Sequence, residues 1–307
     1  IRGSGNMRLP AVVVLAGAVG LAALSPALIF GWGPLPRLGV RGAAVALVAY
    51  YAAGAAIFLA YLLSGRSVVR LARVRLRRAL FADILRVGAP SLVNNVQTNL
   101  SVVVLTALVG PFGSVALAGY GMGVRLEYLQ IPVVFGFGSA LVTMVGTNMG
   151  AGRRARARRV AWTGALMAAA VTETIGLAAA LFPRAWLGLF TSEPGVLAAG
   201  AAYLRIVGPV YGFFGLGLAL YFASQGAGRL GWPLAASALR LLVAAGGGWI
   251  AIHWAGADLD GLFRVMAAAL VALGGTLATA IYLGAWEAGL AVRPLAPRLE
   301  SDHVHDA

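Results

Sequence analysis

Cysteine and lysine are absent from this chain of 307 residues, which has only 10 acidic residues and 3 histidines. Without cysteine the chain cannot form a disulfide, a thiolate metal site or a cysteine nucleophile. Acids and histidines gather only in the tail segment 300–306, where a solvated tail is the interpretation we favour over a metal site. We therefore expect no cofactor and no metal.

Charged residues are scarce as well. They make up 11% of the chain against 60% hydrophobic residues, and the mean hydropathy is +0.86. Soluble proteins have about a quarter charged residues, so this composition indicates an integral membrane protein. The apolar runs are long and do not alternate, which predicts spanning helices rather than a β-barrel. We expect an all-α polytopic membrane protein with eight transmembrane helices, at about 10–30, 43–63, 87–109, 115–147, 160–182, 196–222, 233–254 and 262–284.

Arginine supplies all 24 basic residues and a formal net charge of +14. Such an excess can indicate nucleic acid, but the arginines cluster between the predicted spans, where the positive-inside rule accounts for them, so no nucleic-acid partner is expected. The joints on one side hold 17 arginines, and those on the other side hold only Arg37, Arg41 and Arg184. This asymmetry predicts that both ends of the chain are cytoplasmic.

The joint at 64–86 is longer than the others. Its arginines recur at helical spacing from Arg66 to Arg77, and apolar residues such as Val69 and Leu76 fall on an adjoining face. This pattern predicts a basic amphipathic helix that lies on the inner membrane surface and has membrane lipid as its partner.

A short pattern occurs twice. Residues 2–10, RGSGNMRLP, resemble residues 225–233, QGAGRLGWP, and six predicted spans lie between the copies. An even number of spans preserves orientation, which predicts parallel six-helix units. Residues 1–63 would then form the last two helices of an N-terminal lobe, 64–86 an interfacial linker, 87–286 a complete six-helix C-terminal lobe, and 287–307 a cytoplasmic tail. Four further helices are expected upstream.

Several stretches resemble the multidrug and toxic compound extrusion (MATE) transporters, in particular their bacterial, DinF-like members. The order and spacing of the stretches make the resemblance specific. They are RGSGNMRLP (2–10), PALIFGWGPLPRLGVRGAA (26–44), VGAPSLVNN (87–95), ALAGYGMGVRLEYLQIP (116–132), FGFGSALVTMVGTNMGAGRRARARRVAW (135–162) and YLRIVGPVYGFFGLGLALYFASQGAGR (203–229).

The resemblance implies a secondary antiporter of the bacterial cytoplasmic (inner) membrane. Such a protein exports cationic or amphipathic small molecules in exchange for H⁺ or Na⁺, by alternating access between two six-helix lobes, and it is not an enzyme. The resemblance also implies that this chain holds the fifth and sixth helices of the N-lobe and the whole C-lobe. The remaining N-lobe helices of the same protein, with a proton-coupling Asp on the first, would be its partner.

The family's sodium-dependent branch places carboxylates on its seventh and tenth helices. Here the seventh helix has no acid between Asp83 and Glu127, and the tenth, at 196–222, has Arg205 but no acid. Because a hard cation needs several oxygen ligands and usually a carboxylate, proton coupling is favoured, with sodium as the alternative.

Glu127 is the candidate for proton exchange in the C-lobe. It lies about 18 Å along a helix that begins near Val115, close to the middle of a hydrocarbon layer of roughly 30 Å. A carboxyl group at that depth is costly to keep charged, which makes it a functional candidate by default. Arg125 is two residues away and on a different helix face, so we expect it to be a neighbour that need not clamp the carboxylate. The alternative is that the pair only fastens helices together.

The span at 87–109 has an unusual density of polar side chains: Asn94, Asn95, Gln97, Thr98, Asn99 and Ser101. Unpaired amides in hydrocarbon are costly, so these side chains are expected to face away from lipid. We predict that they form a wall of the substrate cavity, with interhelical hydrogen bonding as the alternative. Tyr211 and Phe214 are further cavity candidates because they could stack on an aromatic substrate, or they could serve packing.

Glu173 is the other deep acid, and we expect it to be a structural partner of Arg205 or Arg240.

Three other functions stay open. A lipid-linked precursor flippase would need a strongly cationic cavity, but few arginines lie within spans: Arg125, Arg205, Arg240 and Arg264. An integral membrane enzyme would need paired acids or a nucleophile set, and only Asp258 and Asp260 are spaced as a pair. A structural scaffold is the third.

The arginine asymmetry predicts that Ser64 and Ser192 lie on opposite sides of the membrane. Because the chain has no cysteine, Ser64→Cys and Ser192→Cys would each introduce the only thiol. An impermeant maleimide applied to intact cells should label the cysteine at 192 alone. Equal labelling of both from outside would contradict this topology.

Overall fold

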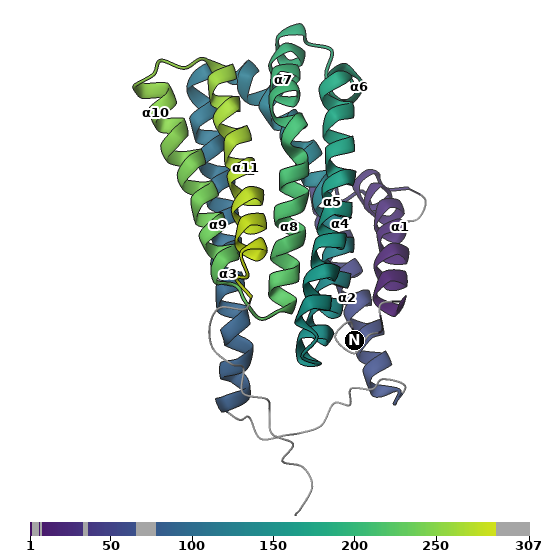
Figure 1. Cartoon of the computed structure of the whole chain (residues 1–307). Coiled ribbons are helices and arrows are strands. Elements are labelled where there is room, and N and C mark those ends of the chain that lie inside the picture. The colour runs from purple at the N-terminus through teal and green to yellow at the C-terminus, as the bar shows by residue number, and fades with distance from the viewer. Residues whose placement is uncertain (2–5, 7, 33–35, 66–77, 287–307) are drawn as a thin grey trace, which may run out of the picture. The chain divides into compact units, whose positions relative to one another are not determined.

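The computed structural model describes residues 1, 6, 8–32, 36–65 and 78–286, and every regular element in these ranges is a helix (Figure 1). It divides into two compact units, Ile1–Arg78 and Ala79–Ala307. The expectation of eight spans is confirmed, since eight stretches are long and apolar enough to cross a membrane. They are Arg8–Phe30, Val40–Leu63, Gly88–Phe112, Ser114–Gly150, Arg154–Leu181, Pro194–Gly226, Gly231–His253 and Leu259–Tyr282.

The first unit is a hairpin of α1 (Arg8–Phe30) and α2 (Val40–Leu63). The helices approach closely because Gly42 has no side chain: a Cβ there would lie 2.5 Å from the carbonyl oxygen of Leu28. Only two residues of each helix are buried, Pro10 and Leu28 in α1 and Gly42 and Ala46 in α2. The hairpin therefore depends on lipid or on other protein segments to cover its apolar surface.

The second unit has four unbroken long helices: α3 (Arg78–Val109), α4 (Ser114–Gly150), α5 (Arg154–Leu181) and α11 (Leu259–Tyr282). The short helices η2 (Gly110–Phe112) and α6 (Pro183–Leu187) lie in the connections after α3 and α5. The α7–α8 span runs through the unit, and α8 packs against α4, α5 and α11 (Figure 1).

Two spans of the second unit change helix type along their length. The 3₁₀ turn η3 (Gly208–Val210) separates α7 (Pro194–Val207) from α8 (Tyr211–Gly226), because Pro209 has no N–H with which to continue an α-helix. The π-helical turn η4 (Val243–Gly247) separates α9 (Gly231–Leu242) from α10 (Gly248–His253). Such π turns often mark functional sites.

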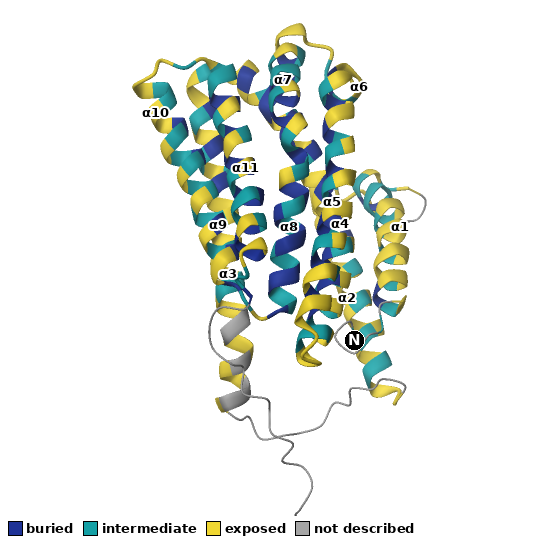
Figure 2. Cartoon of the chain, viewed as in Figure 1, coloured by how far each residue is buried: buried dark blue, intermediate teal, exposed yellow. Residues whose placement is uncertain are grey.

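Small residues bring the helices of the second unit together. Figure 2 shows dark blue and teal, buried and intermediate residues, along most of α8, and 8 of its 16 residues are buried, as are 10 of the 24 residues of α11. A row of alanines on α5 is fully buried: Ala157, Ala161, Ala165 and Ala168. Small residues at interfaces are typical of membrane helices, which gain little from hydrophobic burial against each other and depend on close backbone packing.

Part of the predicted linker is helical. The helix that contains the span expected at 87–109 begins at Arg78, so residues 78–86 are continuous with α3. The rest of the predicted interfacial helix, the tail at 287–307 and most of the first repeat copy lie outside the described residues. The assignment of 1–63 and 87–286 to two lobes stays a prediction.

Gly119 and Gly121 on α4 provide a matched test of this close packing. A Cβ at Gly119 would lie 2.7 Å from the backbone N of Gly200 and 2.8 Å from the carbonyl oxygen of Val196 on α7, whereas no atom lies within 4 Å of one at Gly121. Gly119→Ala should lower the unfolding free energy by about 1–3 kcal/mol through overpacking. Gly121→Ala should be neutral or stabilising by up to about 1 kcal/mol, because alanine favours helix. Thermal unfolding in detergent measures both, and equal effects would contradict the packing described.

Candidate functional site

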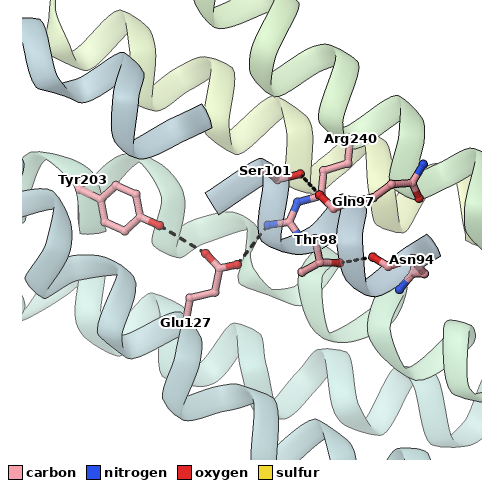
Figure 3. A network of polar contacts seen from close by, with 7 residues as sticks. All are labelled: Asn94, Gln97, Thr98, Ser101, Glu127, Tyr203 and Arg240. Carbon is pink, nitrogen blue, oxygen red and sulfur yellow. Dashed lines mark hydrogen bonds and ion pairs between the residues drawn. The ribbon is translucent and has the colours of Figure 1, made fainter. Parts of the chain in front are cut away.

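An ion pair lies inside the second unit, between α4 and α9. The Nη2 atom of Arg240 is 3.3 Å from the Oε1 atom of Glu127, and the two side chains are 12% and 13% exposed. The other carboxylate oxygen, Oε2, accepts a hydrogen bond from the hydroxyl of Tyr203 on α7, at 3.4 Å (Figure 3). Three helices therefore meet at one carboxylate.

Tyr203 is held in position by its neighbours. Its ring lies against Gly123, one turn before Glu127, where a Cβ would come within 2.4 Å of the ring. It also packs edge-on against Tyr120 and Phe263, with ring centroids 5.4 and 5.2 Å away. These contacts fix the ring and aim its hydroxyl at the carboxylate.

A cavity of about 30 Å³ adjoins the ion pair. Glu127, Arg240 and Tyr203 line it together with apolar side chains such as Val102 and Leu105 of α3. Its volume exceeds the roughly 10–15 Å³ that a buried water molecule needs. The volume is far below the roughly 300–1,000 Å³ of pockets that bind drug-sized compounds.

The burial of this ion pair determines how it responds to the loss of either charge. A buried ion pair loses hydration, and removal of one partner leaves the other charge uncompensated at considerable cost. Protonation of Glu127 would likewise leave the charge of Arg240 uncompensated, since a neutral carboxyl group no longer attracts the guanidinium. The π-helical turn η4 begins three residues after Arg240, so a local change of helix geometry lies next to the cation.

Arg125, the predicted neighbour of Glu127, lies elsewhere. Its side chain is exposed, and its guanidinium carbon is 5.3 Å from the ring centroid of Phe190, a cation–π arrangement. The cation beside Glu127 is Arg240, 113 residues further along the chain.

The polar residues of α3 divide into two groups. Ser101 is buried, and Asn94 and Gln97 are half-buried; Asn94 also accepts a hydrogen bond from the hydroxyl of Ser237 on α9. Asn95, Thr98 and Asn99 are exposed.

Within α3, several of these side chains bond to the backbone of their own helix. Thr98 and Ser101 donate to the carbonyl oxygens of Asn94 and Gln97, and Asn99 donates to that of Asn95, at 2.8–2.9 Å. Figure 3 shows that Asn94, Gln97, Thr98 and Ser101 lie on the part of α3 close to Arg240. Interhelical bonding in this row involves Asn94, while the exposed members offer polar groups on the surface of the second unit.

Tyr211 and Phe214 do not lie on an open surface. Tyr211 is fully buried and Phe214 is 5% exposed, and both belong to the hydrophobic core around Tyr203 and Phe263. This placement differs from the expectation that they line a substrate cavity. They begin α8 directly after the Gly208–Pro209 break, where the chain turns them into the core.

The expected pairing of Glu173 with Arg205 or Arg240 was wrong. Arg240 pairs with Glu127, and the Oε2 atom of Glu173 instead accepts a hydrogen bond from the backbone N–H of Gly212, at 2.6 Å. Gly212 lies in the first turn of α8, whose amide groups lack intrahelical partners. Glu173 therefore caps a helix that begins inside a membrane span.

Sequence reasoning missed Tyr203 and the pairing of Arg240. The available signal was that Glu127 and Arg240 are each among the few ionisable groups within spans, and deep charges tend to pair. Asp258, one of the two closely spaced acids, has a structural role. Its side chain accepts a hydrogen bond from the backbone N–H of Gly261 at 2.8 Å and caps α11.

Comparison with known proteins supports the resemblance. The chain is 28% identical to the FAD transporter of Shewanella oneidensis over 73% of the chain and 50% of that protein. It is 30% identical to the probable multidrug resistance protein NorM of Thermotoga maritima over 75% of the chain and 50% of that protein. The chain therefore spans about half the length of the curated relatives it matches.

The fold is shared with a crystal structure of a mutant of the Vibrio cholerae MATE transporter VcmN. The TM-score is 0.80 at 23% identity, with 93% of this chain and 65% of that chain covered. A sequence profile of the MatE family matches residues 90–250, just over half of the chain. With this match and eight apolar helices, the chain is a multi-pass membrane protein that belongs to the MatE family.

Proposed function

We propose that this chain is part of a secondary antiporter that exports cationic or amphipathic compounds in exchange for H⁺ by alternating access. The observation that carries the proposal is the Glu127 carboxylate, held inside the second unit by Arg240 and Tyr203. Relatives named as multidrug resistance proteins support the export of xenobiotics. Na⁺ is the alternative coupling ion.

Glu127 exchanges the proton, and Arg240 is its counter-ion. In the ionised state the carboxylate holds the guanidinium at 3.3 Å. When Glu127 takes up a proton, Arg240 keeps its charge and loses its partner, and an unpaired buried cation is costly. The free-energy cost of the unpaired guanidinium falls if α9 moves so that Arg240 reaches water. Proton uptake by Glu127 is then coupled to a movement of α9. The π turn at 243–247 and its glycines lie where such a movement would need a compliant backbone.

The exposed polar side chains of α3 supply the substrate wall. Asn95, Thr98 and Asn99 are exposed on a span where contact with hydrocarbon would leave polar groups poorly satisfied. A water-containing cavity removes that penalty. Amide and hydroxyl groups there offer hydrogen bonds to varied compounds without charge selectivity, which suits a multidrug transporter.

A second candidate substrate class follows from the relative named as an FAD transporter. FAD has phosphate groups, which guanidinium groups recognise well. In that case Arg240 would contact the substrate only after Glu127 is protonated and α9 has moved Arg240 to water, so carboxylate and phosphate would compete for the same cation. The proton step is the same for both substrate classes.

The substitution Glu127→Gln in the complete protein should abolish transport driven by a pH gradient, because the amide keeps the shape and cannot exchange a proton. Vesicles in sodium-free buffer would be loaded with a cationic dye or, in parallel, with FAD. With equal amounts of folded protein reconstituted, we expect efflux from the variant at the level of vesicles that contain no transporter. Glu193→Gln, at the exposed N-terminus of α7, is the matched control and should transport normally.

Near-normal proton-driven efflux by the Glu127→Gln variant would assign the residue a structural role and contradict the proposal. A requirement of the unmodified protein for sodium would contradict proton coupling. Transport of FAD without the dye would select the second substrate class.

A further inference from the structure

A groove of about 820 Å³ lies between α4 and α5, on the outside of the core packing. Its α5 wall includes Arg156, Arg159, Thr163 and Met167, and its α4 wall includes Phe137 and Met144. Beneath the groove the helices touch, since Leu141 packs onto Gly164, where a Cβ would come within 2.6 Å of the leucine side chain. The groove is therefore a fixed feature of a packed helix pair.

The groove has a charged end and an apolar end. Arg156 and Arg159 are three residues apart near the start of α5, so they lie on one face of the helix. Met167 lies about 12 Å further along the same helix, at 1.5 Å per residue. The dimensions suit an amphiphile whose headgroup lies at the arginines and whose chain extends toward the middle of the membrane.

The charge of this end favours an anion. No acidic side chain lines the groove, and the first turn of α5 has none. Within the described part of the chain neither Arg156 nor Arg159 has an ion-pair partner. The N-terminus of α5 adds the partial positive charge of its free amide groups. A zwitterionic headgroup would find no carboxylate here for its ammonium group.

We propose that this groove binds one anionic phospholipid, with its phosphodiester on Arg156 and Arg159 and an acyl chain along Phe137, Met144 and Met167. Basic pockets between transmembrane helices on the cytoplasmic side are known to bind anionic headgroups. The positive-inside rule already accounts for an excess of arginine at 153–159. It does not account for the placement of Arg156 and Arg159 in the groove, which Arg153 and Arg154 do not line. This site is independent of the proposed transport activity.

The test compares two double variants that remove the same charge from the same turn. The purified chain in neutral detergent would be titrated with phosphatidylglycerol, and bound lipid measured by native mass spectrometry. Arg156→Gln with Arg159→Gln should weaken binding by about 10- to 30-fold, whereas Arg153→Gln with Arg154→Gln should weaken it by less than about threefold. Phosphatidylcholine should bind the unmodified chain weakly, and soluble glycerol phosphate should not displace the lipid.

A third variant keeps the charge and fills the groove. Thr163→Phe should reduce phosphatidylglycerol binding although all five arginines of 153–159 remain. Equal loss in both arginine variants would reduce the effect to general surface charge and overturn the proposal. So would equal binding of phosphatidylcholine, full displacement by glycerol phosphate, or unchanged binding in the Thr163→Phe variant.

Discussion

The ion pair between Glu127 and Arg240 joins α4 to α9 inside the second unit, and the candidate site depends on it. Two opposite charges in an apolar bundle are tolerated only when each compensates the other and the remaining polar atoms are bonded. Tyr203 supplies the additional hydrogen bond to the carboxylate. That hydroxyl is in reach because Gly123 admits the tyrosine ring and Gly119 lets α4 lie against the backbone of α7. Small residues thus create the geometry in which the buried ion pair is stabilised.

Charged groups and helix breaks occur together in this unit. Glu173 bonds to the backbone N–H of Gly212 where α8 begins after the Gly208–Pro209 break, and Arg240 precedes the π turn of the α9–α10 span. Irregular backbone within a membrane span leaves amide or carbonyl groups that need partners, and transporters of other folds use such broken helices at their ion and substrate sites. The two breaks directly follow α7 and α9, the helices whose side chains contact Glu127.

Hydropathy and glycine or proline punctuation were enough to predict the eight spans, because a membrane imposes length and apolarity on each helix separately. The depth of Glu127 followed from its position along one helix. The sequence limited its partner to the few arginines within spans but could not select Arg240, since a contact between residues 113 positions apart depends on how α4 and α9 are rotated toward each other. Glu173 was paired with the wrong group because the sequence does not reveal that the Pro209 break leaves the Gly212 amide free. Likewise, α3 was treated as one polar wall, although its rotation buries Ser101 and exposes Asn99.

The most direct test of the central claim is a double-mutant cycle on the unfolding free energy in detergent. If Glu127 is ionised and compensated by Arg240, Arg240→Gln alone should cost about 3–5 kcal/mol, because it leaves a buried carboxylate without its cation. Adding Glu127→Gln should recover much of that loss, because the double variant leaves neither charge unpaired, so its cost should fall well below the sum of the two single-variant costs. Additive losses in the double variant would show that the two side chains are near each other without depending on each other, and would contradict the account.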